Sequence, residues 1–191
     1  MEKSLHKTIE TTIMSSDPGS LFVVSDFLHL GSYEAVKRAL ARLAKTPNVT
    51  RVLRGLYQKT DTTLPSPYDV AFALARHHAW TIIPSGETAL ALLGFKKAAE
   101  LPIEFVSDGP YRTIQYQDHT IVFKHRMKRE ITPLSFQSAL IVEALKALGE
   151  DNLKETHRRH IRKILNTKQL SKLKQETARS RIWIQQFIQT L

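Results

Sequence analysis

The sequence predicts an α+β protein that joins a small N-terminal domain of helices and a β-hairpin to a larger mixed α/β domain. Three observations lead to this class. Residues 32–45 have the apolar spacing of an amphipathic helix, and residues 48–59 alternate between apolar and polar around an Arg54-Gly55 turn, as a hairpin does. Further along, three strand-like runs lie between residues 103 and 124, with helical segments on either side.

A polar, proline-interrupted stretch separates the two parts. It reads DTTLPSP at residues 61–67, and its two prolines favour an extended path. We therefore expect one domain at residues 1–60 and a second at residues 66–191. The chain has 191 residues and 42% hydrophobic side chains, which is enough to bury a substantial core.

The composition excludes several classes of protein. The chain has no cysteine, which rules out disulfides and thiolate metal sites and fits a reducing cytosol. No apolar run approaches the roughly 18 residues that a membrane span needs. The N-terminal MEKSLHKTIETT mixes both charge signs and lacks an apolar signal core, so we expect a cytoplasmic protein.

The net charge of +10 is concentrated at the two ends of the chain. Residues 1–59 carry nine Lys/Arg against five Asp/Glu, a balance of +4. Residues 60–150 carry nine against ten, a balance of −1, and residues 151–191 carry ten against three, a balance of +7. Two basic ends around a nearly neutral middle predict contacts with a polyanion at one end or at both.

The first elements follow from periodicity and turn residues. Apolar residues share one face of a helix over residues 2–15, which the Asp-Pro-Gly turn at 17–19 ends. The apolar run 22–24 is either a minor strand or a helix-packing segment. A Ser-Asp pair at 25–26 is placed to cap a brief helix, and a glycine then turns the chain into the next one.

The helix at residues 32–45 is the most informative element. Ser32 is placed to cap its N-terminus, its apolar residues fall on one face, and its basic residues fall on the others. With the brief helix before it and the basic hairpin after it, the layout is that of a winged helix-turn-helix. The second helix of that motif enters a DNA major groove. We therefore predict that the chain reads DNA.

The residues predicted to touch DNA lie on the second helix and on the hairpin. Lys and Arg side chains suit guanine edges and phosphates, whereas Ser and Tyr hydroxyls suit phosphates. The alternative interpretation is an ordinary amphipathic helix whose solvated face is basic. The predicted DNA-binding residues are Ser32, Tyr33, Lys37, Arg38, Arg42, Arg51, Arg54 and Lys59.

The second domain is predicted to be a sheet with helices before and after it. A helix over 66–78 precedes a buried strand at 80–83 and a helix that starts at Ser85 and stops at Gly94. Three strand-like runs follow, and the short turns between them favour an antiparallel meander. The strand runs are 103–107, 113–116 and 120–124, and the C-terminal helices are 135–148, 152–165 and 169–188.

No catalytic or metal-binding set emerges from the sequence. The phosphate-loop and nucleophile-elbow motifs are absent, and no spacing ties the acidic residues Glu104, Asp108 and Asp118 to a metal. His157 and His160 share a helix face, but the arginines around them repel a divalent metal. We therefore expect a non-enzymatic protein with no cofactor and no metal.

The basic C-terminal helices allow three interpretations: a second DNA-phosphate surface, a platform for an acidic protein, or a solvated face. Two rival functions for the whole chain follow from the same features. One is an enzyme or accessory that acts on nucleic acid through the second domain. The other is a protein-binding module that grips an acidic partner with the C-terminal helices.

Three segments together resemble the AbiEi-like antitoxins of type IV bacterial toxin–antitoxin systems. They are RVLRGLYQK at 51–59, PSPYDVAFALARHHAWTIIPSGETALALLGF at 65–95 and SDGPYRTIQYQDHTIVFKHR at 107–126. The resemblance covers most of residues 1–150 and does not extend over the last forty residues.

The resemblance implies an N-terminal winged helix that represses the protein's own operon, bound at inverted repeats in the promoter. It also implies a second domain that counteracts a nucleotidyltransferase-like toxin, without a stable complex between the two. The winged-helix role falls on Ser32 to Arg42 and on Arg51 to Lys59. The resemblance assigns no catalytic positions, and the sequence leaves the oligomeric state open.

Overall fold

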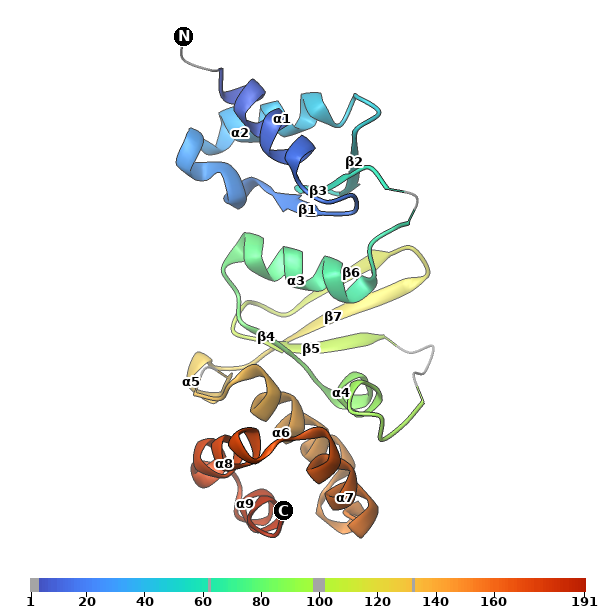
Figure 1. Ribbon diagram of the computed structural model, residues 1–191, viewed down its shortest axis with the longest axis vertical. Helices are drawn as coiled ribbons and strands as arrows, with labels where there is room; N and C mark the ends of the chain where they lie inside the picture. The colour runs from blue at the N-terminus through green and yellow to red at the C-terminus, as the bar shows by residue number, and fades with distance from the viewer. Residues whose placement is uncertain (1–3, 62, 98–101, 132) are drawn as a thin grey trace. The chain divides into compact units, whose positions relative to one another are not determined.

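The computed structural model describes residues 4–61, 63–97, 102–131 and 133–191 (Figure 1). The protein is a mixed α+β protein with two small sheets. It consists of two compact units, Met1–Trp80 and Thr81–Leu191. The first two residues of the predicted first helix, Glu2 and Lys3, lie outside the described residues.

The first part of unit 1 contains two α-helices, a short strand and a 3-10 helix. Ser4 caps the first helix, since its hydroxyl accepts a hydrogen bond from the Lys7 N–H at 3.4 Å. Ser32 caps the third helical element in the same way, with the Ala35 N–H as donor at 3.4 Å. The elements are α1 (Leu5–Ser15), β1 (Leu21–Val23), the 3-10 helix η1 (Val24–Leu30) and α2 (Tyr33–Leu43).

The predicted hairpin is confirmed and forms a sheet with β1. Its strands are β2 (Val49–Leu53) and β3 (Leu56–Lys59), and the sheet order is β1-β3-β2 with all pairs antiparallel. The turn at Arg54 and Gly55 needs a glycine, because Gly55 has a φ of +83°, in a region that a side chain disfavours. The apolar run 22–24 is thus largely a strand.

The core of unit 1 lies between α1, η1, α2 and the sheet. The predicted apolar faces are buried: Ile9 and Ile13 of α1 and Val36 and Leu40 of α2 all have no exposed surface. Burial on this scale contributes roughly 1.5–3 kcal/mol for each large aliphatic side chain. It also fixes the rotation of α2, so the basic residues on its opposite faces point to solvent.

Helix α3 (Pro67–His78) belongs to unit 1. It begins where the sequence predicts, with Ser66 accepting a hydrogen bond from the Asp69 N–H at 3.2 Å. The guanidinium of Arg76 then ties α3 to the rest of the unit, through Asp26 at 3.0 Å and the Leu21 carbonyl at 3.0 Å. The structure therefore divides the chain after Trp80, whereas composition places the boundary in the proline-interrupted stretch.

Unit 2 contains a four-stranded sheet of order β4-β5-β7-β6. The predicted antiparallel meander is wrong, because β5 pairs with β7 in parallel and does not pair with β6. Only the β6–β7 and β4–β5 pairs are antiparallel. The strands are β4 (Ile82–Pro84), β5 (Ile103–Ser107), β6 (Arg112–Tyr116) and β7 (His119–His125).

Burial explains this order. β7 contains Ile121, Val122 and Phe123, all buried, which suits a central strand covered on both faces. β6 is mostly polar and exposed, so it takes the edge. In the link from β5 to β6, Asp108 accepts a hydrogen bond from the Thr81 N–H at 2.7 Å.

Helices make up the rest of unit 2 (Figure 1). The predicted continuous helix over 169–188 is wrong: the chain leaves helical geometry at Ser180 and starts a new helix at Ile182. This corner folds Ile184 and Phe187 back onto the core that contains Leu173, which one straight helix would not allow. The helices are α4 (Gly86–Leu92), α5 (Lys128–Ile131), α6 (Phe136–Leu148), α7 (Glu155–Ile164), α8 (Thr167–Glu176) and α9 (Ile182–Gln189), with 3-10 turns at Glu150–Asn152 and Thr177–Arg179.

Candidate nucleic-acid interface

The N-terminal turn of α2 presents polar groups to solvent. Tyr33 is 46% exposed, and the Lys37 ammonium lies 5.8 Å from the centre of its ring. Lys37 also pairs with Glu34 at 3.4 Å, an exposed contact that contributes little to stability. These three side chains form one exposed group at the end of the helix that meets base edges in helix-turn-helix proteins.

Two arginines continue this surface along α2. The Arg38 Nε donates to the Glu34 carbonyl oxygen at 3.2 Å, which leaves its terminal nitrogens pointing outward. Arg42 lies one turn further on and is exposed, and its guanidinium has no hydrogen-bond or ion-pair partner among the described residues. The predicted α2 residues thus lie on the exposed side of one helix, whose other side is buried.

The hairpin residues divide into two groups. Arg51 and Arg54 are exposed, and the one contact of their guanidinium groups within the described residues is Arg51 Nε to the Leu53 carbonyl at 3.4 Å. Lys59 is different, because its ammonium donates to the carbonyl oxygens of Met14 (2.7 Å) and Ser16. Those carbonyls lie at the C-terminal end of α1, so Lys59 acts as a cap for that helix. The ammonium that the sequence predicts to contact DNA is thus occupied within unit 1.

His77 lies close to both the N-terminal end of α2 and the hairpin turn. The sequence alone does not predict this position. Its ring centre lies 6.5 Å from that of Tyr33. A β-carbon at Gly55 would lie 3.9 Å from its Nε2 atom, so the turn passes close to the same ring. His77 comes from the end of α3, more than forty residues from Tyr33 along the chain. No local spacing signals such a contact.

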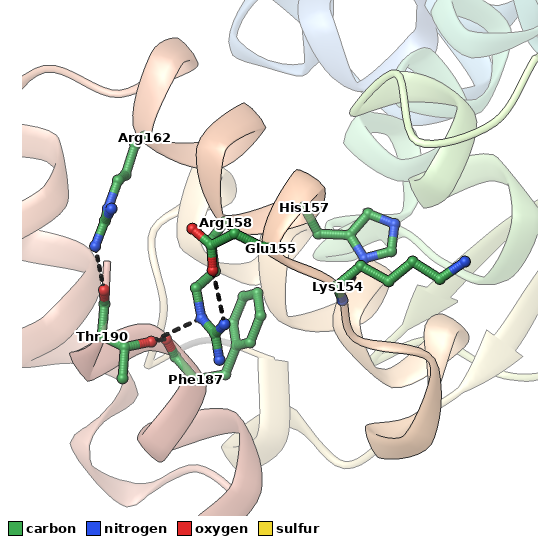
Figure 2. Close-up of polar contacts among 7 residues, drawn as sticks. All are labelled: Lys154, Glu155, His157, Arg158, Arg162, Phe187 and Thr190. Atoms are coloured by element: carbon green, nitrogen blue, oxygen red, sulfur yellow. Dashed lines mark hydrogen bonds and ion pairs between the residues drawn. The ribbon is translucent and has the colours of Figure 1, made fainter.

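The basic C-terminal helices use several of their cations inside unit 2. Arg158 of α7 donates to the Thr190 hydroxyl and to Glu155, each at 2.9 Å, and its guanidinium carbon lies 4.9 Å from the centre of the Phe187 ring. Arg162 donates to the Thr190 carbonyl (Figure 2). Lys174 of α8 reaches the Gln189 carbonyl at 3.2 Å.

These three cations therefore gather at the C-terminal end of α9. Helix C-terminal carbonyls lack partners within the helix and carry the negative end of its dipole, so cations there are stabilising. The positive charge of residues 151–191, a balance of +7, is consequently not all available to a partner. Other basic side chains, such as Arg159 and Lys163, remain exposed.

The histidines of α7 pack against an aromatic ring. Phe95 lies 4.8 Å from His157 and 5.5 Å from His160, measured between ring centres. Burial lowers the pKa of His157, and the neighbouring Lys154 and His160 lower it further. In the part of the chain that the structure describes, no three His, Asp or Glu side chains are grouped as a metal site requires.

The acidic residues of the sheet have structural partners. Glu104 pairs with Lys124 at 2.7 Å, and Asp108 holds the Thr81 N–H. Both therefore serve the fold, as the sequence favours. Within the described ranges, no helix combines the length and apolar character needed to cross a bilayer.

Comparison with protein families assigns most of the chain to one of them. The model of a protein family described as DUF6088, a family of unknown function, matches residues 8–173. No curated protein matches the chain. The family description names no activity, so a function has to be argued from the geometry above and from the resemblance of the three segments.

Proposed function

We propose that this chain, which belongs to the DUF6088 family, is a DNA-binding autorepressor that also acts as the antitoxin of a type IV toxin–antitoxin system. The observation that carries the DNA-binding part is the exposed basic face of α2, held opposite a fully buried face and followed by a basic hairpin. In this proposal α1, η1, α2 and the hairpin act as a winged helix-turn-helix.

The proposed contacts follow from the reach and chemistry of each side chain. Tyr33, Lys37 and Arg38 lie toward the N-terminal half of α2 and read base edges in the major groove. Arg42 and Arg54, whose guanidinium groups are exposed, bind phosphates, and Arg51 assists them. Phosphate contacts supply affinity, and base contacts supply the preference for one sequence.

The antitoxin part rests on resemblance. The segments 65–95 and 107–126 resemble AbiEi-like antitoxins, whose toxins are nucleotidyltransferase-like proteins. We propose that residues 66–191 counteract such a toxin without catalysis and without a stable complex, in the cytoplasm of a bacterium. The operator that the chain represses is an inverted repeat in the promoter of its own gene. Such a repeat suits binding at two neighbouring half-sites.

Fluorescence anisotropy tests the DNA-binding part. DNA from upstream of the protein's own gene is compared with scrambled DNA while the salt concentration is raised. The proposal expects a preference of about 10³-fold or more for the upstream DNA that survives physiological salt. Equal binding to both DNAs, lost as salt rises, would leave only a basic surface and contradict the repressor.

Co-expression tests the antitoxin part separately. The products of genes adjacent to this one are expressed with and without the chain, and growth is measured. The proposal expects one neighbour to arrest growth and the chain to restore it. Rescue that is preserved when Lys37 and Arg38 are both changed to Ala would locate the antitoxin activity outside the α2 surface. A neighbourhood with no toxic product would contradict the antitoxin role.

A further inference from the structure

Unit 2 contains a pocket of about 460 Å³ next to the corner between α8 and α9. Its volume lies within the range of about 300–1,000 Å³ that is usual for small-molecule sites. The buried part of its lining is apolar. Ile83 of β4, Val106 of β5, Ile131 of α5 and Ala139 of α6 meet there as a separate small cluster, each at most 4% exposed.

The acidic residues of the lining already have partners. Glu143 pairs with Lys146 at 2.7 Å, and their side chains are only 11% and 25% exposed. Glu176 accepts hydrogen bonds from the Ser135 hydroxyl at 2.7 Å and from the Ser135 N–H at 3.1 Å. Burial opposes ionisation of Glu176, but the hydrogen bonds from Ser138 and Ser135 and the charge of Lys172 outweigh it and lower its pKa. Glu176 is therefore ionised at neutral pH, and both carboxylates are held by groups of the protein.

The arginines of the lining are not balanced in this way. Five cations and three acids line the pocket, which leaves a net charge of +2. Arg126 lies 3.8 Å from Glu130. Arg129, Arg179 and Arg181 are exposed, and none of them has an acidic partner among the described residues. The lining thus combines a buried apolar cluster with guanidinium groups that have no acidic partner among the described residues.

We propose that this pocket binds a small phosphate ester with an apolar or aromatic body. Guanidinium groups match the geometry of phosphate oxygens and form charge-assisted hydrogen bonds with them. The net charge of +2 suits a dianion, and the apolar residues of the lining give the body of the ligand groups to contact. This site is separate from the α2 surface, so it stands whether or not the chain binds DNA.

Three small probes test the proposal on the full chain. 1-Naphthyl phosphate has both the anion and the body, inorganic phosphate has only the anion, and 1-naphthol has only the body. Titration calorimetry is expected to show naphthyl phosphate binding at least about tenfold more tightly than either of the others. If inorganic phosphate or naphthol binds as tightly as naphthyl phosphate, the two-part site does not exist.

Matched variants locate the binding. Arg179→Gln with Arg181→Gln is expected to weaken naphthyl phosphate binding by about tenfold, because charge-assisted hydrogen bonds are lost. Arg159→Gln is the control, since it removes an exposed arginine of α7 that does not line the pocket. All three arginines are exposed, so these changes leave the buried core intact. Equal losses in the double variant and in the control would overturn the proposal.

A second variant tests the apolar interior. Ala139→Met places a longer side chain into the pocket and is expected to abolish naphthyl phosphate binding, with a thermal melt to show that the variant folds. Unchanged binding in a folded Ala139→Met variant would overturn the assignment to this cavity. Binding of a single-stranded oligonucleotide that needs Arg179 and Arg181, without any binding of naphthyl phosphate, would show a nucleic-acid surface in place of a small-molecule site.

Discussion

Arg42 and Arg54 in unit 1 and Arg158 and Arg162 in unit 2 all belong to strongly basic segments, but their surroundings differ. In unit 1 the two guanidinium groups have no polar partner among the described residues. In unit 2 Arg158 and Arg162 both donate to Thr190 at the end of α9, and Arg158 also holds Glu155 (Figure 2). Lys174 reaches the same helix end.

The difference shows that the net charge of a segment does not measure the charge that a partner meets. The last forty-one residues carry a balance of +7 and the first fifty-nine only +4. The C-terminal helices nevertheless direct cations toward carbonyl groups of their own unit, where they stabilise a helix end. In unit 1, Lys59 is likewise directed to carbonyl groups at the end of α1, so each segment offers a partner less charge than its balance indicates.

The largest expected effect concerns the bases that α2 reads. Changing Lys37→Ala and Arg38→Ala together should reduce the preference for upstream DNA by on the order of 10²-fold, because good base contacts contribute about 1–3 kcal/mol each. Anisotropy with upstream and scrambled DNA measures this ratio. Lys163→Ala with Arg159→Ala on α7 is the matched control and should leave it unchanged. If the α7 pair reduces the preference as much, the two regions do not differ.

The next effect concerns stability in unit 2. Arg158→Ala should lower the free energy of unfolding by about 1.5–3 kcal/mol, since it removes charge-assisted hydrogen bonds and the contact with Phe187. Arg159→Ala, one position along the same helix, should change it by less than about 0.5 kcal/mol. Urea unfolding of both variants measures the difference. Similar losses would mean that the end of α9 does not depend on Arg158.

Lys59 and Arg54 give a matched pair within the hairpin. Lys59→Met should cost about 1–2 kcal/mol of stability, because two carbonyls at the end of α1 lose their donor. It should leave the salt dependence of DNA binding unchanged. Arg54→Gln should do the reverse, with normal stability and a slope of log K against log salt that is smaller by about 1. A Lys59 variant with a reduced slope would return that residue to the DNA surface.

The smallest effect concerns pH. The pKa of His157 is lowered in the folded protein, so the unfolded chain takes up a proton first as the pH falls below about 6.5. Above that pH, His157 does not lower the free energy of unfolding. As the pH falls further, the free energy of unfolding decreases until the pH passes the lower pKa of the folded state. His157→Asn should flatten this loss in melts between pH 7.5 and 5.5. A His119→Asn variant, changed at an exposed position, should retain it.

Local patterns predicted most of unit 1 and the surface of α2. The burial of Val36, Leu40 and Leu43 follows from their spacing, and Ser32 and Ser66 begin helices because their hydroxyls satisfy free N–H groups. The hairpin follows from alternation around a glycine with positive φ. Each of these outcomes depends on residues within one or two turns of each other.

Contacts across the chain decided the rest. His77 lies beside Tyr33 and near Gly55 because α3 packs against the other elements of unit 1. The same packing places the end of unit 1 at Trp80. The ammonium of Lys59, which the sequence predicts to contact DNA, donates to the carbonyl oxygens of Met14 and Ser16 for a similar reason, since β3 and the end of α1 come together only in the folded unit.

By itself, the sequence determined where most helices and strands form and which faces of α1 and α2 are buried, because periodicity and capping act over a few residues. Only the tertiary structure decided that β5 pairs with β7 in parallel, that the last predicted helix breaks at Ser180, and that cations of α7 and α8 meet the end of α9. These outcomes depend on which segments compete for the same buried surface and the same hydrogen-bond acceptors. That competition is settled between residues far apart in the chain, where local spacing carries no information.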